Sequence, residues 1–217
     1  MRFKKLQGFA ICILLVSSFL ASISLLVLPV HATGISLVQG PKRAVSTTVS
    51  LVFTLDSTPT VGNCLVLVFG SRGDSEEAAY YRSITSVVET NVVWTVNATK
   101  TISYGAYIGL DVEIWIGSPI SASASKTVTV TCSNNPDSGR EVGNICEYSG
   151  LDTLSIYDKS QTSSGTSVSP ATGATATTTR ADELWIGGTV SVLAQAIPTY
   201  GFTLRDGALL TSVLSLS

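Results

Sequence analysis

The stretch Thr127-Val128-Thr129-Val130-Thr131-Cys132 alternates strictly between polar and apolar side chains. Successive side chains of a β-strand point to opposite faces, so a period of two is typical of a strand with one buried face. After residue 32, no stretch sustains the 3.6-residue apolar stripe of a helix, and only residues 74–81 have the composition of a helical turn. The sequence therefore predicts an all-β chain.

Other stretches have the composition of strands and are separated by Gly, Asn, Ser and Pro turns. They are residues 48–55, 64–69, 84–88, 92–96, 106–116, 142–148, 184–192 and 200–204. Many short strands of this kind are typical of sandwiches and barrels. We expect one antiparallel β-sandwich domain over residues 33–217, jelly-roll-like in topology, since about 185 residues can enclose one core.

Residues 160–179 are rich in Ser, Thr, Gly and Ala and carry no charge before Arg180. Two interpretations compete for this segment. It is either a flexible linker that carries O-linked sugars, or a loop followed by a Thr-rich edge strand over residues 171–178. The strand is favoured, because β-branched Thr fits a half-exposed sheet and a strong strand pattern follows at once.

The first 32 residues have the pattern of an export signal. Arg2, Lys4 and Lys5 precede an uncharged, largely apolar stretch over residues 8–30, and Ala32 is a small residue suited to cleavage before Thr33. The apolar stretch is also long enough to span a bilayer as a helix, so an uncleaved membrane anchor is the alternative. Either way, the protein is expected outside the cell or at its surface.

Charge and histidine content exclude several functions for residues 33–217. Removing Arg2, Lys4 and Lys5 leaves ten of the thirteen Lys and Arg against fifteen Asp and Glu, so a basic nucleic-acid surface is absent. The single histidine, His31, lies before the proposed cleavage site. The mature domain therefore has no imidazole for a catalytic triad or a His-ligated metal, and we expect no cofactor and no metal.

Three cysteines follow the signal segment. Cys12 belongs to that segment, and Cys64, Cys132 and Cys146 remain. A disulfide between Cys132 and Cys146 is the best candidate, because the two residues flank one polar loop and export permits pairing. The alternative is that all three are small buried core residues.

The sequence places carboxylates beside tryptophans at two positions. Asp111, Glu113 and Trp115 share one strand face, and Glu183 and Trp185 repeat the Glu-x-Trp spacing. Such a set can form a platform for sugar rings, with or without glycosidase chemistry. The simpler interpretation is a pair of similar strands with solvated acids.

Two further residues are singled out by their sequence context. Asn97, followed by Ala98 and Thr99, forms an N-glycosylation sequon. Glu147, which precedes Tyr148 and Ser149, is expected to be a solvated or loop-anchoring acid rather than a catalyst.

A series of short motifs gives the chain a wider resemblance. These motifs lie at residues 35–39, 59–69, 94, 112–116, 128–131, 147–152 and 182–187. In this order they resemble β-sandwich modules of secreted and surface proteins of bacteria and archaea and of some phage structural proteins. The resemblance implies a scaffold or adhesion role and assigns no functional residue. It also implies one or two strands beyond residues 200–204.

Three classes of function follow. The first is a non-enzymatic surface or secreted module with a structural or adhesive role, whose partners are surface glycans or other envelope proteins. The second is a filament subunit: Lys4 to Gly8 resembles a type IV pilin leader, with Phe9 to Val30 as the assembly helix, although residues 9–14 lack the glutamate of bacterial pilins. The third is a carbohydrate-binding module or glycosidase.

The apolar C-terminal residues suggest a route to self-association. Leu209, Leu210, Val213, Leu214 and Leu216 have the composition of a strand without a protective charged tail. We expect this strand to form an open sheet edge that pairs with another chain.

Overall fold

Strands account for all the regular structure in the described part of the chain. In the computed structural model, the described residues are 34–74, 81–105, 108–133, 138–167, 171–192, 206–208 and 214–216, all within one compact unit, Thr33–Ser217. No helix occurs among them, so the all-β prediction is confirmed. The predicted signal or anchor segment lies outside these ranges, as do residues 75–80 of the helical turn predicted over residues 74–81. None of the described residues forms a helix that could cross a membrane.

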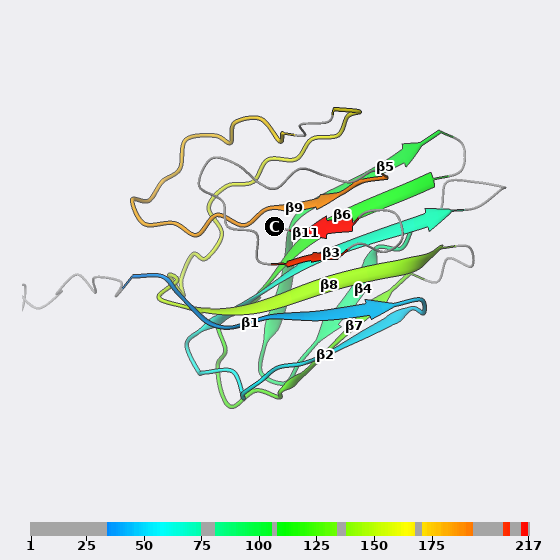
Figure 1. Cartoon of the computed structure of the whole chain (residues 1–217). Helices are drawn as coiled ribbons and strands as arrows, with labels where there is room; N and C mark the ends of the chain where they lie inside the picture. Colours follow the sequence, from blue (N-terminus) through cyan, green and yellow to red (C-terminus); the bar gives the residue numbers. More distant parts are fainter. Residues whose placement is uncertain are drawn as a thin grey trace, which may run out of the picture. The chain divides into compact units, whose positions relative to one another are not determined.

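The larger sheet has five antiparallel strands in the order β1-β8-β3-β6-β5 (Figure 1). Their bounds are β1 Ser36–Ser46, β8 Ser138–Ser149, β3 Cys64–Asp74, β6 Ile108–Ser118 and β5 Val93–Tyr104. Because β3 pairs with β8 on one side and β6 on the other, it is the centre of the sheet. Its position fits its continuous apolar sequence, which is typical of a strand covered on both faces.

The smaller sheet faces one side of the larger one. It contains β2 (Ser50–Thr54), β7 (Thr127–Cys132) and β4 (Ile84–Val88) in the order β2-β7-β4, all antiparallel. The predicted period-two pattern of β7 is confirmed, because Val128, Val130 and Cys132 are buried while the intervening threonines are not.

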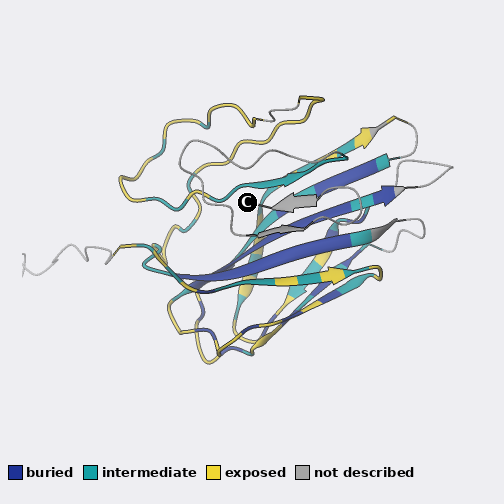
Figure 2. Ribbon diagram, in the orientation of Figure 1, coloured by how far each residue is buried: buried dark blue, intermediate teal, exposed yellow. Residues whose placement is uncertain are grey.

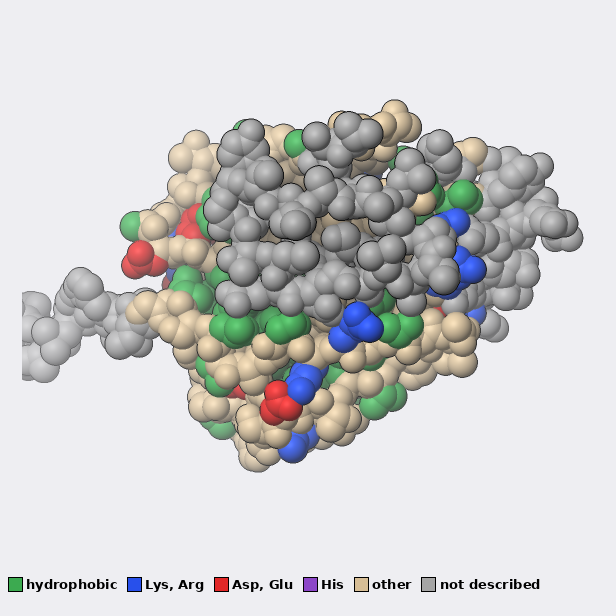
Figure 3. Space-filling model, in the orientation of Figure 1, with side chains coloured by type: hydrophobic (Ala, Val, Ile, Leu, Met, Phe, Trp, Pro, Cys, Tyr) green, Lys and Arg blue, Asp and Glu red, His purple; other side chains and the backbone are tan. Residues whose placement is uncertain are grey.

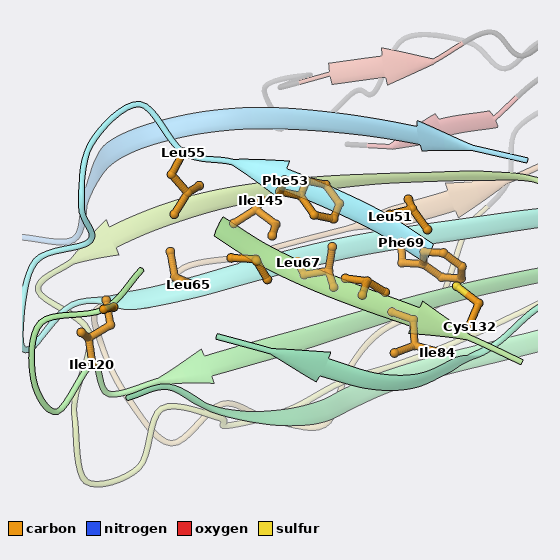
Figure 4. Close-up of a cluster of buried hydrophobic side chains, with 13 residues drawn as sticks. Leu51, Phe53, Leu55, Leu65, Leu67, Phe69, Ile84, Ile120, Cys132 and Ile145 are labelled. Carbon is orange, nitrogen blue, oxygen red and sulfur yellow. The ribbon is translucent and has the colours of Figure 1, made fainter. Parts of the chain in front are cut away.

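The core between the two sheets comes from alternate positions on their facing strands (Figure 4). β2 and β3 contribute Leu51, Phe53, Leu65, Leu67 and Phe69, all nearly inaccessible to solvent. Phe53 reaches the backbone of β8, where a Cβ on Gly143 would lie 2.7 Å from its ring. The lack of a side chain at Gly143 therefore makes room for the largest core residue of β2.

A third layer covers the opposite face of the larger sheet. The described residues between β8 and β9 (Gly188–Val190) have no regular structure, and β9 lies against β3 and β6. These residues and β9 are hereafter the covering layer. Ile186 and Val190 pack on Val68 and Val142, while Leu151 and Leu184 pack around Val66, Cys146 and Tyr148. Figure 2 accordingly shows the central strands of the larger sheet buried, because layers cover both of their faces.

The chain ends in a small antiparallel sheet. It contains β10 (Asp206–Ala208) and β11 (Leu214–Leu216) in the order β10-β11-β9. β11 is the middle strand and pairs with β10 on one side and β9 on the other. The expectation that the C-terminal strand forms an open edge is therefore wrong for residues 214–216.

Strand predictions failed mainly in the covering layer. Residues 171–178 are not a strand, and of the predicted strand 184–192 only Gly188–Val190 forms one. Residues 183–187 are held by apolar side chains on the larger sheet rather than by a hydrogen-bonded ladder. The strand predicted over residues 200–204 lies outside the described residues.

We predict that Phe53→Ala lowers the free energy of unfolding by about 3–5 kcal/mol, because it leaves a cavity between the sheets. The matched control is Val52→Thr on the same strand, where the side chain is 56% exposed. The control should change stability by less than about 0.5 kcal/mol. Urea denaturation of both variants provides the measurement, and equal losses would contradict the assignment of this core.

Candidate functional site

The inner face of β6 carries the acids that the sequence singled out. Asp111 lies opposite Ser71 of β3, and Glu113 lies opposite Phe69, so both point between the two sheets. Asp111 is 0% and Glu113 is 4% exposed. The predicted sugar platform requires Asp111 and Glu113 at the surface, and the structure places both in the interior instead.

Glu113 joins the two sheets through its carboxylate. The backbone N–H of Ile84, the first residue of β4, donates to Oε1 at 2.7 Å, and the indole Nε1 of Trp115 donates to Oε2 at 2.6 Å. Both oxygens therefore have a donor, one from each sheet. A buried carboxylate that accepts strong hydrogen bonds is well compensated for its loss of water.

Arg82, just before β4, makes further links to the larger sheet. Its Nη1 lies 3.1 Å from Oε1 of Glu141 on β8, and both side chains are almost fully buried. The same nitrogen donates to the backbone oxygen of Thr47 at 3.3 Å. Ser71 exchanges two hydrogen bonds with the Arg82 backbone, donating to its oxygen at 2.7 Å and accepting from its nitrogen at 3.0 Å.

Asp111 has no such compensation. Its two oxygens are buried and accept no hydrogen bond from the described residues. Burial, followed by the close Glu113 carboxyl and its negative charge, raises the pKa of Asp111 to about 8, even though the nearby Ser83 and Val112 lower it. A raised pKa of this kind favours the protonated form of Asp111 at neutral pH, as in other pairs of close carboxyl groups.

The neighbouring groups are shifted in the same direction. Burial raises the pKa of Glu141 to about 7, even though the Arg82 guanidinium lowers it. Cys132 on β7 faces the same group, and burial, followed by the negative charges of Glu141 and Glu113, raises its thiol pKa to about 12. One group of buried polar side chains thus lies between the sheets, hereafter the buried carboxyl cluster: Ser71, Arg82, Asp111, Glu113, Cys132 and Glu141.

Glu147, on the inner face of β8, is a buried acid outside this cluster and anchors a loop. Its Oε1 accepts hydrogen bonds from the Thr60 backbone N–H at 2.8 Å and from Asn63 Nδ2 at 2.6 Å. Gln39 Nε2 donates to the other oxygen at 2.5 Å. Of the two roles expected for Glu147, loop anchoring is confirmed.

Burial, followed by the charge of Glu147, raises the pKa of the nearby Glu89 to about 7.

Glu183 and Trp185 do not join the buried carboxyl cluster. Both precede β9 in the covering layer, where Glu183 is half-buried and Trp185 is 51% exposed. The predicted pair of similar strands is wrong, because residues 183–187 are not a strand while residues 113–117 lie in β6. Of the expected sugar-platform residues, only Trp185 is largely exposed.

The cysteines form no disulfide in the described residues. Cys64, Cys132 and Cys146 are all buried thiols. Cys132 belongs to the core between the sheets, whereas Cys146 packs with Val66 and Tyr148 on the opposite face of the larger sheet. The bridge predicted between Cys132 and Cys146 is therefore wrong, since a sheet separates the two side chains.

Asn97 lies on β5, at the edge of the larger sheet. Val96 pairs with Trp115 and Ala98 with Ile114, which leaves Asn97 without a partner residue in a β-bulge. The side chain is half-buried, and its oxygen is buried without a hydrogen-bond partner. The glycosylation of Asn97 stays a prediction.

Sequence reasoning missed Arg82, Ser71 and the role of Glu141. The sequence held one clue to the role of Glu141. Glu141 and Glu147 lie at the two ends of an apolar strand pattern, an even number of residues from the core residue Ile145, so all three share one strand face. Among the described residues, no three His, Cys, Asp or Glu side chains come together in a way that would hold a metal ion.

We predict that Arg82→Met lowers the free energy of unfolding by about 3–5 kcal/mol at pH 8, because it leaves Glu141 buried without its cation. The loss should shrink at pH 5, where Glu141 is protonated. Lys42→Met is the control, since it breaks the exposed Lys42–Asp56 pair and should cost less than about 1 kcal/mol. Equal costs by urea denaturation would contradict this role for Arg82.

The raised pKa values predict that stability falls as pH rises. In the unfolded chain Glu89, Asp111 and Glu141 ionise near pH 4, whereas in the folded chain they keep their protons up to about pH 7 to 8. Between these limits each carboxyl lowers the free energy of unfolding as pH rises, because the unfolded chain has released a proton that the folded chain keeps. We expect greater stability at pH 5 than at pH 8 in urea titrations across this range.

Asp111→Asn tests the largest contribution separately. The amide keeps the shape of the side chain and a donor toward Glu113, but it cannot ionise. We expect the variant to be more stable than the wild type at pH 8 by about 1–3 kcal/mol and similar to it at pH 5. A wild-type pH profile that the substitution leaves unchanged would show that Asp111 does not retain a proton.

Comparison with known proteins found no similar protein. No family model matches the chain, and no curated protein and no solved structure is significantly similar to it.

Proposed function

We propose that the protein is a non-enzymatic exported module with a structural or adhesive role outside the cell. The observation that carries the proposal is the use of the buried acids. Glu113, Glu141 and Glu147 hold strand ends and loops in place, and Asp111 is closed off between the sheets. The acids that a glycosidase would need at its surface thus serve to join the sheets.

The topology supports a jelly-roll-like scaffold. β1 neighbours β8, β2 neighbours β7, and β3 neighbours β6, so the strands pair from the ends of this set inward. Such nested pairing arises when a long antiparallel ribbon rolls into two facing sheets, as in jelly rolls. One departure is that β5 stays beside β6 in the larger sheet instead of extending the smaller one.

The exposed surface also favours scaffolding over catalysis or ionic binding. In Figure 3 the described part of the visible face consists mostly of neutral side chains and backbone, with scattered charged groups. Trp185 is half-exposed and, with Tyr157, offers aromatic surface to a glycan or an envelope protein. We therefore propose binding through side chains of the covering layer and not through a pocket.

The first test is the mass and location of the protein made by its own cells. We expect it in the medium or on the cell surface, with Thr33 as its first residue. Recovery of a chain that begins at Phe9 would favour the pilin-like filament, and a chain that keeps Met1 would favour a membrane anchor. A protein that stays in the cytoplasm would contradict the proposal.

The second test is turnover of carbohydrates. The chain from Thr33 onward is incubated with a panel of polysaccharides, and new reducing ends are measured. We expect no release above that of heat-denatured protein. If release were detected and either Glu183→Gln or Glu113→Gln abolished it, with folding intact by circular dichroism, the protein would be a glycosidase and not a scaffold.

A further inference from the structure

The segment that the sequence left open between a strand and a glycosylated linker is a projecting loop. Residues 160–167 and 171–179, hereafter the hydroxyl loop, contain no strand or helix. All of residues 160–167 are exposed, and residues 171–179 are exposed or half-buried. Figure 2 shows this part of the covering layer as an exposed arc beside the larger sheet.

The base of the hydroxyl loop is fixed by polar contacts. Arg180 pairs with Asp152, and Asp158 accepts hydrogen bonds from the Thr179 backbone at 2.7 Å and from its hydroxyl at 2.8 Å. These hydrogen bonds hold the pKa of Asp158 well below its usual range. On both sides of this base, Leu151 and Leu184 are packed on the larger sheet. The loop is thus presented from an anchored stem.

The hydroxyl loop has only one chemical feature in abundance. Between Lys159 and Arg180 it has no charge, no aromatic residue and, in its described residues, no side chain larger than Gln161. The hydroxyl-bearing residues are Ser160, Thr162, Ser163, Ser164, Thr166, Ser167, Thr172, Thr175, Thr177, Thr178 and Thr179. Ionic and hydrophobic binding are therefore poor explanations for a loop of this length, which in a compact domain usually has a function.

Most of these hydroxyls are not needed by the fold. Thr162, Ser163, Ser164 and Thr166 are exposed and have no hydrogen bond to another described residue. In a strand, these threonines would pack on a sheet, but the described residues of the hydroxyl loop form no strand. Clustered Ser and Thr in exposed extended chain are the usual acceptors of O-linked sugars.

We propose that the hydroxyl loop is a site of O-glycosylation that carries several neutral sugars. In each transfer, a Ser or Thr Oγ attacks the anomeric carbon of a sugar activated as a nucleotide or lipid phosphate ester. The new carbon–oxygen bond forms as the bond to the phosphate breaks; the phosphate leaves with the electron pair, and the hydroxyl proton passes to a base of the transferase. The inference does not depend on the scaffold role.

Sugars fit this loop better than phosphate groups. Several phosphates on adjacent hydroxyls would repel each other, and the loop has no Lys or Arg between its two ends to pair with them. Neutral sugars can be attached side by side without this cost. They would also cover apolar surface near the stem, where Leu154 is 95% exposed.

Trypsin isolates this segment, because Lys159 and Arg180 flank it in the sequence. Protein from its native cells is digested, and peptide 160–180 is analysed by mass spectrometry with fragmentation that preserves side-chain modifications. We expect this peptide to be heavier by whole sugar residues that map to the hydroxyl loop. Peptide 127–140, which contains the threonines of β7, should have its unmodified mass.

A variant with Ala at Thr162, Ser163, Ser164 and Thr166 provides the second arm. It should lose the sugars attached to residues 162–166 and keep the melting temperature of the wild-type protein after enzymatic sugar removal, since these four side chains have no hydrogen-bond partner among the described residues. Peptide 160–180 found only at its unmodified mass, or carrying phosphate, would overturn the proposal. Peptide 33–42 in the same digest shows independently whether the chain is cleaved before Thr33. A failure of the export proposal can therefore be distinguished from a failure of the glycosylation proposal.

Discussion

The hydrogen bond from the Ile84 backbone to the Glu113 carboxylate fixes how the two sheets meet. Ile84 begins β4 of the smaller sheet, and Glu113 lies in β6 of the larger one. Apolar packing alone would hold the sheets together without fixing one arrangement, because it has no direction. A buried carboxylate is costly unless its donors are in place, so Glu113 penalises arrangements that shift β4. Arg82 and Ser71 reinforce the same end of the sheets through backbone and side-chain contacts.

The same physical logic explains why polar groups lie at both ends of an apolar core. Leu67 and Phe53 fill the middle of the core. Glu113 accepts from the backbone N–H of Ile84, the first residue of β4, and Glu147 accepts from that of Thr60, in the loop between β2 and β3. Such N–H groups need an acceptor when buried. Carboxylates supply it where no neighbouring strand does. The raised pKa of Asp111 follows from its burial and from this arrangement, since a second charge beside Glu113 would have no compensation.

The strands could be predicted from sequence because alternation is a local property, but the inward direction of Asp111 and Glu113 could not. The opposite face of β6 carries Leu110, Val112 and Ile114, so the pattern favours that face as the buried one. In the protein both faces are covered, one by the smaller sheet and one by the third layer. Register against β3, which depends on distant residues, decides where the acids point. Local propensity also failed at residues 171–178, where no neighbouring strand is available to pair with the threonines.

The covering layer is the most weakly attached part of this fold. Its regular structure is limited to the short strand β9 and its neighbours, and Ile186 and Val190 are among the few apolar side chains that attach it to the larger sheet. The close approach of Gly188, where a Cβ would lie 2.7 Å from Val68, shows that this contact depends on a missing side chain. Segments with few buried contacts and a short ladder open at lower free energy than central strands. The polar contacts at Asp152 and Asp158 join parts of this layer to each other, next to the apolar contacts that Leu151 and Leu184 make with the sheet, so Val66 becomes exposed only when those apolar contacts separate.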